Sequence, residues 1–486
     1  MGLRYLYANL KEYQDDAIIL EFTINEALQT VAEKILEQQP EIVGIGVYIW
    51  NASEVKELIE IIKKVSSETV IVLGGPEVSH EPFRVNYDLA DFIIQGEGDL
   101  AFQTLCRQVD TDTAPDDKII KQSMPNLAEI ALPYEYYSND DIKNRYTYVE
   151  ASRGCPFECE FCLSSIDERV RYFDIDLLLE TFETLWQRGV RNFKFIDRTF
   201  NLNMKFANVL LDFFLSKEPP YFAHFEVIPD HFPESIKQKM KAFPEGSLQL
   251  EIGIQTLNPE IADNISRPLK LEKIKKNIRF FEQETKVHLH LDLIVGLPGE
   301  TLKSFGRNLD ELCSISSSEI QIGILKKLSG TAMSRHDKIF GMVYSDVPPY
   351  DILQNDLLTF ATIQQMKRFA RFWDLVYNSG NFSQTSKLLR DDGKVFDGFF
   401  AFSEWIYEQT QSTWKISLDR LAKLLFDYLS EHKKRDLQVV AEAMVHDLMK
   451  IKGRSIPPYL KPFMSEQRVE GKQREGTGRK RQDGRA

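Results

Sequence analysis

The stretch SRGCPFECEFCLSS, from Ser152 to Ser165, decides how this chain is interpreted. It holds Cys155, Cys159 and Cys162 in a C-x3-C-x2-C run, which brings three thiolates together in one short loop. Thiolates are the protein ligands of iron–sulfur clusters, and a run of three leaves one metal position without a nearby protein ligand. The run therefore predicts a cluster that keeps one iron open for chemistry.

Two other kinds of site place cysteines close together, and the sequence argues against both. Structural zinc takes four ligands, and neither a Cys nor a His follows the run at the spacing of a zinc finger or ribbon. Disulfide frameworks are typical of small secreted domains, whereas this chain has 486 residues, 5 cysteines and no recognisable signal peptide. We expect the remaining cysteines, Cys106 and Cys313, to be buried structural thiols.

Composition indicates a globular protein of two or three domains in a reducing cytoplasm. The chain is 43% hydrophobic and 27% charged, and no apolar run approaches the roughly 18 residues that a membrane-spanning helix needs. The formal net charge of -13 argues against nucleic acid as a partner, because a polyanion would be repelled. The one basic stretch, residues 464–486, is expected to be a disordered tail, with nucleic-acid contact as the alternative.

Residues 1–109 alternate between strand and helix patterns. Helices are expected over residues 25–38 and 53–65, and strands over residues 3–9, 41–51, 69–79 and 90–99. The pattern predicts a flavodoxin-like (Rossmann-like), doubly wound α/β domain, in which ligands bind outside the carboxyl ends of the strands. A polar linker is expected over residues 110–145.

Residues 146–335 repeat a strand–helix unit six times. The strand patterns cover residues 146–154, 192–201, 221–229, 247–258, 287–300 and 319–331. Six parallel units predict a partial (β/α)6 TIM barrel, whose active residues lie at the carboxyl ends of the strands and on their inner face. The first strand runs directly into the cysteine loop, so the barrel pattern predicts the same position for the cluster.

The segment 345–463 is rich in aromatic residues and has helical periodicity, which predicts a mostly helical C-terminal domain. Its stretch FARFWDLVYN, residues 369–378, could cover a substrate. Aromatic stripes at helical spacing are usually buried, so packing in a core is favoured.

The cysteine run, with Phe161 directly before the third cysteine, resembles the cluster motif of the radical S-adenosylmethionine (radical SAM) enzymes. In that family a [4Fe–4S] cluster binds SAM through its open iron and cleaves it to methionine and a 5′-deoxyadenosyl radical. The resemblance implies the same two cofactors here, together with an electron donor such as flavodoxin or ferredoxin.

The same resemblance implies which barrel residues contact SAM. Asp197 lies where the second strand of the family contacts the methionine amino group, although the usual Gly-Gly-Glu is absent. Glu226, Glu251 and Gln255 correspond to polar residues of the third and fourth strands that face the ribose and the carboxylate. Gly296 matches the glycine turn of the fifth strand, near the adenine.

Two arginines, Arg153 and Arg198, flank the cluster end of the predicted barrel and could bind a carboxylate bidentately. A charged side chain inside a barrel needs a partner, because desolvation is costly. The alternative for each charged candidate is therefore a structural ion pair, such as Glu251 with Arg267.

Three N-terminal segments, VGIGVYIWN, VLGGPEVS and IIQGEGD, resemble the cobalamin-binding domain that precedes the barrel in many radical SAM enzymes. The resemblance implies a third cofactor, cobalamin. Four glycines would let the backbone approach the corrin or its nucleotide tail closely: Gly74, Gly75, Gly96 and Gly98.

The D-x-H-x-x-G loop of cobalamin-dependent mutases is absent, so no histidine is expected below the cobalt. His80 is expected to be an ordinary loop residue. Tyr48, Trp50 and Asn51 are then candidates for the lower face of the cobalt, with simple packing as the alternative for the aromatic pair.

Together these resemblances imply a cobalamin-dependent radical SAM enzyme that methylates an unactivated carbon or phosphorus centre of a small-molecule or peptide substrate. Two alternatives stay open. One is a radical SAM enzyme without bound cobalamin that catalyses a different radical reaction. The other is a non-catalytic iron–sulfur sensor protein.

Overall fold

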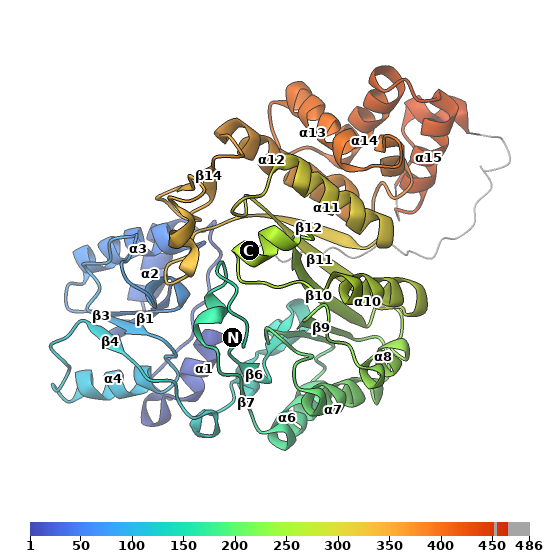
Figure 1. The fold of residues 1–486 in the computed structure, drawn as a ribbon. Helices are drawn as coiled ribbons and strands as arrows, with labels where there is room; N and C mark the ends of the chain where they lie inside the picture. The colour runs from blue at the N-terminus through green and yellow to red at the C-terminus, as the bar shows by residue number, and fades with distance from the viewer. Residues whose placement is uncertain (452–453, 465–486) are drawn as a thin grey trace.

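Two parallel sheets organise the chain, which the computed structural model describes over residues 1–451 and 454–464. Figure 1 shows the smaller N-terminal sheet beside the larger, six-stranded sheet, with the C-terminal helices packed beyond the last strands of the larger sheet. The expected α/β architecture with a helical C-terminal part is therefore confirmed.

The N-terminal sheet has four parallel strands in the order β1-β2-β3-β4. They cover Ile42–Gly46, Val70–Gly74, Phe92–Gln95 and Ile119–Lys121. Helices α2 (Leu28–Leu36) and α3 (Ala52–Val65) pack on one face, and α4 (Ala101–Asp110) packs on the other. Strand β4 comes from the segment expected to be a linker, so this segment extends the sheet.

The strand expected over residues 3–9 is wrong, because these residues form helix α1 (Gly2–Ala8). Two consecutive residues of this helix are buried by contacts outside the N-terminal sheet. Tyr5 packs into an aromatic group beside the barrel, and Arg4 forms a buried ion pair with Asp141. Because these residues form no strand, the strands of the N-terminal sheet lie side by side in the same order as in the sequence.

All six strands expected in the barrel are present, parallel and paired in the order β5-β8-β9-β10-β11-β12. They cover Thr147–Val149, Asn192–Phe195, Phe222–Val227, Leu248–Gln255, His288–Val295 and Glu319–Ile324. A short antiparallel pair, β6 (Ser152–Arg153) and β7 (Arg171–Tyr172), follows β5.

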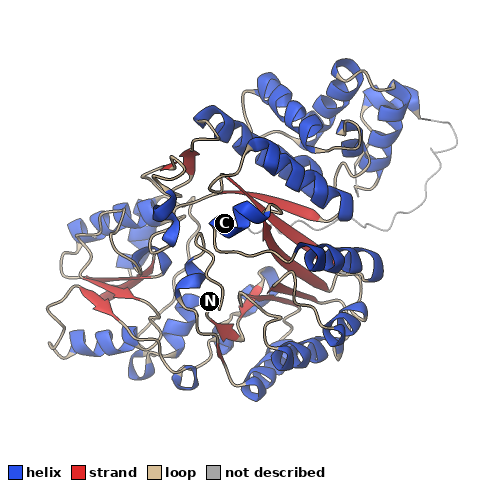
Figure 2. Ribbon diagram, viewed as in Figure 1, coloured by secondary structure: helices blue, strands red, loops and turns tan. Residues whose placement is uncertain are grey.

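Helices cover the outer side of this sheet, as Figure 2 shows. They are α6 (Ile175–Gln187), α7 (Met204–Leu215), α8 (Glu234–Lys241), α10 (Leu271–Glu284) and α11 (Leu302–Ile315), with α5 (Asn139–Asn144) before β5 and α9 (Pro259–Asn264) before α10.

The two faces of the barrel sheet differ in polarity. Every second residue of β11, from Leu289 to Val295, is buried against the outer helices. The alternate residues, His288, His290, Asp292 and Ile294, face the inside and stay partly accessible to solvent. The interior of a complete TIM barrel is packed with branched apolar side chains. Here the inner face is polar and solvated, so it can accommodate a polar ligand.

The C-terminal helices continue the core of the barrel. They are α12 (Phe360–Trp373), α13 (Phe396–Thr410), α14 (Leu418–Asp427) and α15 (Leu437–Met449). Phe369, Phe372 and Trp373 are fully buried, and Trp373 Nε1 donates a hydrogen bond to Ile320 O of β12 at 2.9 Å. The interpretation of residues 369–378 as core is confirmed.

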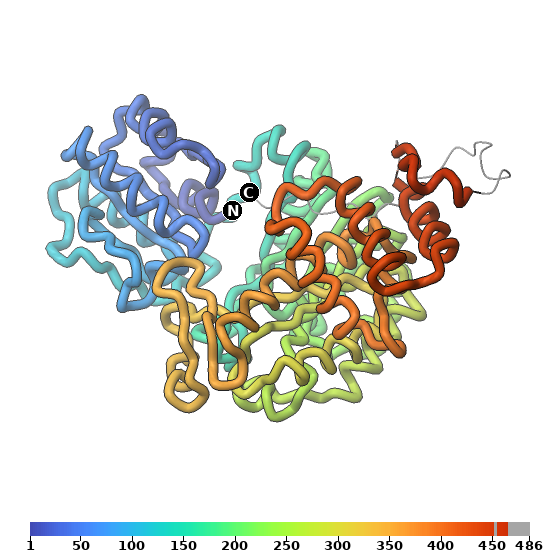
Figure 3. Tube along the Cα trace, turned by 90° about the horizontal axis from the view of Figure 1, so that it is seen from above, coloured from blue at the N-terminus to red at the C-terminus, as the bar shows by residue number. Residues whose placement is uncertain are grey.

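The segment between β12 and α12 lies between the two sheets, where Figures 1 and 3 show it in yellow-orange beside the blue N-terminal domain. It forms the hairpin of β13 (Val343–Tyr344) and β14 (Ile352–Gln354). The Tyr350 hydroxyl of this segment donates to the Glu77 carboxylate, in the loop after β2. The loops that follow the carboxyl ends of the two sheets therefore meet.

No helix within residues 1–451 and 454–464 is both long enough and apolar enough to cross a membrane. Residues 465–486, which make up nearly all of the expected basic tail, lie outside the described residues.

Candidate active site

The cysteine run forms the loop between β6 and β7, at the carboxyl end of β5. Two backbone hydrogen bonds shape this loop: Cys155 N donates to Asp167 O at 2.9 Å, and Cys162 N donates to Cys159 O at 3.0 Å. Cys155 and Cys159 are buried, and burial raises the pKa of the Cys155 thiol. Cys162 stays partly accessible.

The spacing of the sulfurs distinguishes a cluster from a single metal ion. Thiolates around one zinc lie roughly 3.8 Å apart, because each Zn–S bond is about 2.3 Å long. Among the residues that the structure describes, these three sulfurs are not a group whose ligand atoms all lie within 4.8 Å of one another. A cluster takes thiolates at wider spacing, since each binds a different iron. The three sulfurs are therefore not gathered as tightly as a site for a single zinc ion requires.

Gly154 makes the sharp entry into the cysteine loop. Its φ angle is +92°, and a Cβ atom at this position would lie 2.2 Å from Arg169 O. Glycine alone avoids both the backbone strain and the contact. The chain can therefore fold closely back on itself directly before Cys155.

Arg267 ties the loop to the barrel. Its Nη1 lies 3.1 Å from Cys159 Sγ, and its Nη2 donates a hydrogen bond to Gly253 O of β10. A guanidinium at this distance can donate a hydrogen bond to the sulfur and so holds the Cys159 side chain in place. Nothing in the sequence marked Arg267 for this contact, because it lies far from the cysteines along the chain.

Glu160, between the second and third cysteines, anchors the loop a second time. Its carboxylate is 3% exposed and accepts hydrogen bonds from Ser266 Oγ at 2.6 Å and from Arg335 Nη2. His336 Nε2 lies 2.7 Å from the other carboxylate oxygen. The loop is thereby held by the segments after α9 and after β12.

Asp197, expected to contact the methionine amino group of SAM, holds the chain that leads into the cysteine loop. Its carboxylate is 3% exposed and accepts hydrogen bonds from Ala151 N at 3.1 and 2.9 Å and from Ser152 Oγ at 2.5 Å. Burial raises its pKa to about 7, although these hydrogen bonds oppose the shift. The carboxylate therefore fixes the two residues that follow Glu150.

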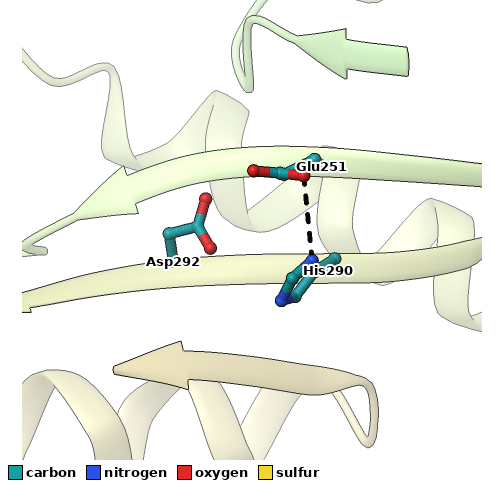
Figure 4. A group of neighbouring side chains, drawn as sticks. All are labelled: Glu251, His290 and Asp292. Atoms are coloured by element: carbon teal, nitrogen blue, oxygen red, sulfur yellow. Dashed lines mark ion pairs between the residues drawn. The ribbon is translucent and has the colours of Figure 1, made fainter. Parts of the chain in front are cut away.

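Glu251 is the centre of a carboxylate–imidazole group on the inner face of the barrel. Register places it beside Glu226 of β9 and His290 of β11. Its Oε2 lies 3.0 Å from Nε2 of the buried His224 and 3.9 Å from His290 Nδ1, the pair drawn in Figure 4. Burial raises the pKa of Glu251, but the imidazoles and Lys194 outweigh burial and lower it to about 2.

The ion pair of Glu251 with Arg267, expected as the alternative to a functional role, is wrong. His224 pairs with Glu251 instead, and Arg267 turns to Cys159. His224 and Glu251 lie on neighbouring strands with both side chains on the inner face, so their contact follows from the register of β9 and β10.

Asp292 lies beside this group and is a candidate that the sequence pattern did not single out. Its Oδ1 is buried and has no hydrogen-bond partner among the described residues. Burial, and then the charges of Glu251 and Glu226, raise the pKa of Asp292 well above the usual value. A carboxyl group that keeps its proton can donate a hydrogen bond to a ligand as well as accept one. The signal for it was the H-x-H-x-D alternation that begins at His288.

The ligand atoms of Glu251, His290 and Asp292 lie within 4.8 Å of one another. Figure 4 draws these three side chains. One imidazole and two carboxylates form a donor set that divalent metals accept. Glu251 already pairs with His224, and burial with the nearby carboxylates raises the pKa of Asp292. The group therefore offers both acceptors and a possible donor to a ligand that carries hydroxyl or amino groups.

Both arginines at the cluster end of the barrel bind protein carboxylates. Arg198 Nη1 lies 3.2 Å from Glu226 Oε1, and burial raises the pKa of Glu226 while Arg198 opposes the shift. Arg153 binds Asp99 of the N-terminal domain bidentately, which is the structural ion pair given above as the alternative to a functional role.

Gln255 ends β10 with a φ angle of +67°, at a bulge in the pairing with β11. A Cβ atom at Gly253 would lie 2.4 Å from Gln255 Nε2, so this glycine leaves room for the amide to fold back over the strand. Strained residues of this kind are often found at ligand sites. Gly296 turns the chain after β11. A Cβ atom at this position would lie 2.8 Å from Ile352 Cγ2, so the glycine lets the backbone pass close to Ile352.

The carboxyl ends of β2 and β3 carry the glycines expected to approach cobalamin. Gly75 has a φ angle of +110°, and a Cβ there would lie 2.6 Å from Val47 O, so this glycine serves the turn itself. A Cβ at Gly74 would have its nearest neighbour 3.9 Å away, and one at Gly96 would have it 3.5 Å away. Gly74 and Gly96 therefore leave open backbone, which suits the close approach of a large ring.

Gly98 and His80 both serve packing. A Cβ at Gly98 would lie 3.6 Å from Leu6 Cδ2 of α1. His80 lies against Gly330, in the segment after β12, and burial lowers its pKa.

The loop after β1 presents an aromatic pair. Tyr48 and Trp50 are stacked with ring centroids 4.6 Å apart, and Trp50 is 60% exposed. A large exposed indole can stack on a planar ligand. Asn51 holds the turn beneath this pair, since its Oδ1 accepts from Tyr48 N at 2.7 Å and its Nδ2 donates to Gly46 O at 3.0 Å. This turn ends β1 at Gly46, although the strand pattern runs to residue 51.

Gly154→Ala is expected to prevent cluster assembly, because its Cβ would meet Arg169 O. Gly189→Ala is the matched control: its φ angle is +100°, but no atom lies within 4 Å of the Cβ position. The control should suffer only backbone strain of about 1–2 kcal/mol and keep its iron. Iron per chain after anaerobic reconstitution measures both effects. Full iron in Gly154→Ala would show that the loop does not need this turn.

Asp197→Asn is expected to make stability less dependent on pH. The pKa of Asp197 is about 7 in the folded protein, against 3.8 for an unperturbed Asp. Between these two values the unfolded chain has already released the proton, whereas the folded chain still holds it. The free energy of unfolding of the wild type therefore falls as pH rises from about 4 to about 7. An amide cannot ionise. Melting temperatures at pH 5 and pH 8 should therefore differ less in Asp197→Asn than in the wild type or in the exposed control Asp116→Asn.

Three family models match the chain. The B12 binding domain matches residues 1–106, the Radical SAM superfamily matches residues 149–312, and "Protein of unknown function (DUF4080)" matches residues 338–482. The aromatic C-terminal part thus corresponds to a family whose function is not described.

Two curated relatives are methyltransferases. An uncharacterized methyltransferase of Pyrococcus horikoshii is 24% identical over 435 residues, which are 82% of this chain and 87% of that protein. The cobalamin-dependent radical SAM methyltransferase TokK of Streptomyces tokunonensis is 23% identical over 371 residues, which are 67% of this chain. The match spans only 53% of TokK.

Two solved structures share the fold. The cobalamin-dependent SAM radical enzyme OxsB has a TM-score of 0.59 at 13% identity, and the match covers 91% of this chain and 76% of that one. The radical SAM methyltransferase TsrM from Kitasatospora setae has a TM-score of 0.56 at 15% identity, with 74% and 78% covered. The chain therefore combines a B12 binding domain with a Radical SAM domain, and its cofactors are a [4Fe–4S] cluster, SAM and cobalamin.

Proposed function

We propose that this enzyme is a methyltransferase that methylates an unactivated carbon or phosphorus centre of a small-molecule or peptide substrate. The observation that carries the proposal is how the two domains face each other. Loops after β2 and β3 contact the segments after β12 and β5, through Glu77 with Tyr350 and through Asp99 with Arg153. Ligands of both folds bind at these strand ends, so the two cofactor sites would open toward each other.

When bound, the cluster and SAM supply a 5′-deoxyadenosyl radical, and cobalamin supplies the methyl group. The residues of the chain hold and orient these groups. Cys155, Cys159 and Cys162 would provide the thiolates, while Arg267 stabilises the charge on Cys159 through its 3.1 Å contact. Phe161 packs against the barrel core and keeps the third cysteine in place.

SAM would bind on the inner face of the barrel beside the cluster loop. Glu226 and Glu251 offer carboxylates to its ammonium and hydroxyl groups, and Gln255 offers an amide at the end of β10. The protonated Asp292 can donate to a ribose oxygen, which would satisfy its unpartnered Oδ1. The turn at Gly296 lies where the adenine would reach the segment after β12.

Asp197 would assist SAM binding indirectly. Its hydrogen bonds to Ala151 and Ser152 fix the chain that enters the cysteine loop, and its carboxylate keeps lone pairs for a methionine ammonium nearby. Whether it only holds the backbone or also accepts from the ammonium, Asp197 would stabilise the end of the barrel that carries the cluster loop.

Cobalamin would lie across the carboxyl ends of the N-terminal strands. Gly74 and Gly96 supply open backbone, Gly75 and Gly98 shape the loops, and Asn51 holds the turn that presents Tyr48 and Trp50. His80 packs on Gly330, so the cobalt would be bound without histidine ligation from this loop.

The partners follow from this chemistry. The polar inner face of the barrel suits a polar substrate. Each reductive cleavage of SAM consumes one electron, so a donor such as flavodoxin or ferredoxin would serve the enzyme in the cytoplasm.

Cys155→Ala, Cys159→Ala and Cys162→Ala are each expected to abolish formation of 5′-deoxyadenosine from SAM, because each removes one of three thiolates. The buried thiols of Cys106 and Cys313 lie elsewhere, so their Ala variants should retain it. The measurement is 5′-deoxyadenosine after reduction with dithionite. Product from any of the first three variants would contradict the cluster assignment, and none from the wild type would favour a sensor.

Gly74→Val is expected to weaken cobalamin binding by about tenfold or more, because its side chain enters open space at the strand end rather than the protein. Its melting temperature and its yield of 5′-deoxyadenosine should stay near wild type. His80→Ala, in the following loop, should leave both the affinity and the base-off cobalamin spectrum unchanged. A wild type that cleaves SAM but binds no cobalamin would favour a radical reaction without methyl transfer.

A further inference from the structure

Two arginines flank the cysteine loop and both bind the N-terminal domain. Arg153 ends β6, two residues before Cys155, and Arg171 begins the returning strand β7. Their shared partner is Glu97, in the loop after β3. The loop that carries the cluster ligands is therefore joined directly to one of the loops proposed to hold cobalamin.

Arg153 is held by three carboxylates. Its Nη1 lies 2.8 Å from Glu97 Oε2 and 2.8 Å from Asp99 Oδ2, and its Nη2 lies 3.1 Å from Asp99 Oδ1 and 2.9 Å from Glu150 Oε1. The pairing with Asp99 is bidentate, which fixes direction as well as distance. Arg153 also lies over the ring of Tyr5, at 4.8 Å from its centroid.

Arg171 binds the other oxygen of the same glutamate. Its Nη2 pairs with Glu97 Oε1 and lies 3.2 Å from Asp167 Oδ2, and its Nη1 donates to Pro125 O at 3.0 Å. Arg171 Nη1 also donates to Glu97 Oε2 at 3.4 Å, so both arginines bind the same carboxylate. Asp167 in turn accepts the amide of Cys155 through its backbone, so the network reaches the first cluster ligand.

The burial of these groups makes the network rigid. The side chains of Arg153, Glu97 and Asp99 are 14%, 22% and 9% exposed. Removing one partner from a pair of this kind leaves a buried charge uncompensated, which is far more costly than losing a surface ion pair. Burial raises the pKa of Glu150, and Arg153 opposes that shift.

We propose that Arg153 and Arg171 are positioning residues that hold the Glu97 loop at a fixed place relative to the cluster before cobalamin binds. Glu97 lies between Gly96 and Gly98, so the position of its side chain sets the position of the backbone proposed to face the corrin. The inference rests on the proposed function, because the distance between the two sites matters only if a methyl group passes between them.

Glu97→Gln is the variant that tests this role, because it removes the charge shared by both arginines without changing shape or touching a cysteine. Glu404→Gln is the matched control. Glu404 pairs with Arg368 in the C-terminal helices, and the two side chains are 25% and 20% exposed. Three quantities are compared in reconstituted protein: amide exchange of residues 92–101 without cobalamin, 5′-deoxyadenosine from SAM without cobalamin, and S-adenosylhomocysteine from SAM with added cob(I)alamin.

The expected result for Glu97→Gln is about tenfold faster exchange in residues 92–101 and about tenfold less S-adenosylhomocysteine, with iron content and 5′-deoxyadenosine within twofold of wild type. Glu404→Gln should match the wild type in all of them. Unchanged exchange, or faster exchange with undiminished S-adenosylhomocysteine, would overturn the inference. A parallel fall in 5′-deoxyadenosine would also overturn it, because the network would then only support the cluster.

The two proposals fail in different ways. If the wild type makes no S-adenosylhomocysteine with cob(I)alamin, the proposed methyl transfer fails. Exchange in the cobalamin-free protein then still decides whether Glu97 holds the loop, so normal exchange in Glu97→Gln would refute the inference by itself.

Discussion

The need to hold three thiolates on one loop is the constraint on which the rest of the structure depends. A loop with two buried cysteines must satisfy its polar groups inside the protein, and it does so with side chains from distant parts of the chain. Gly154 lets the backbone turn, Asp197 holds the residues before the loop, and Glu160 and Arg267 bind it to the barrel. These contacts come from the segments after β8, α9 and β12, which are far apart in the sequence.

The barrel that carries this loop is open, and its interior shows the consequence. Several inner residues of its six strands, such as His290 and Asp292 of β11, stay partly accessible to water, which allows carboxylates and imidazoles where a closed barrel would pack apolar layers. These groups then govern one another. His224 keeps Glu251 ionised, and the charges of Glu251 and Glu226 help to keep Asp292 protonated. Carboxyl groups on neighbouring strands therefore present both acceptors and a donor to a ligand.

The loops at the carboxyl ends of the strands in the two sheets contact each other, and ligands of both folds bind at these strand ends. Contacts across this boundary combine buried ion pairs at Glu97 with a tyrosine hydroxyl on Glu77. Charge pairs with little exposure fix geometry better than apolar contact does, because their direction is set by hydrogen bonds. A reaction that uses two cofactors requires such a fixed relation between their sites.

The sequence by itself determined the six barrel strands and the position of the cysteine run at the end of the first of them. Strand patterns that alternate with helix patterns identified all six barrel strands, and the cysteines form a local motif that can be recognised without knowledge of the fold. Tertiary structure decided the rest. Residues 3–9 lie in a helix, in which Arg4 forms an ion pair with Asp141, far along the chain. Glu251 pairs with His224 rather than with Arg267, because the register of β9 and β10 places these two side chains together. The partner of a charged side chain and its pKa depend on burial and on neighbours from other strands. A local sequence pattern contains no information about either.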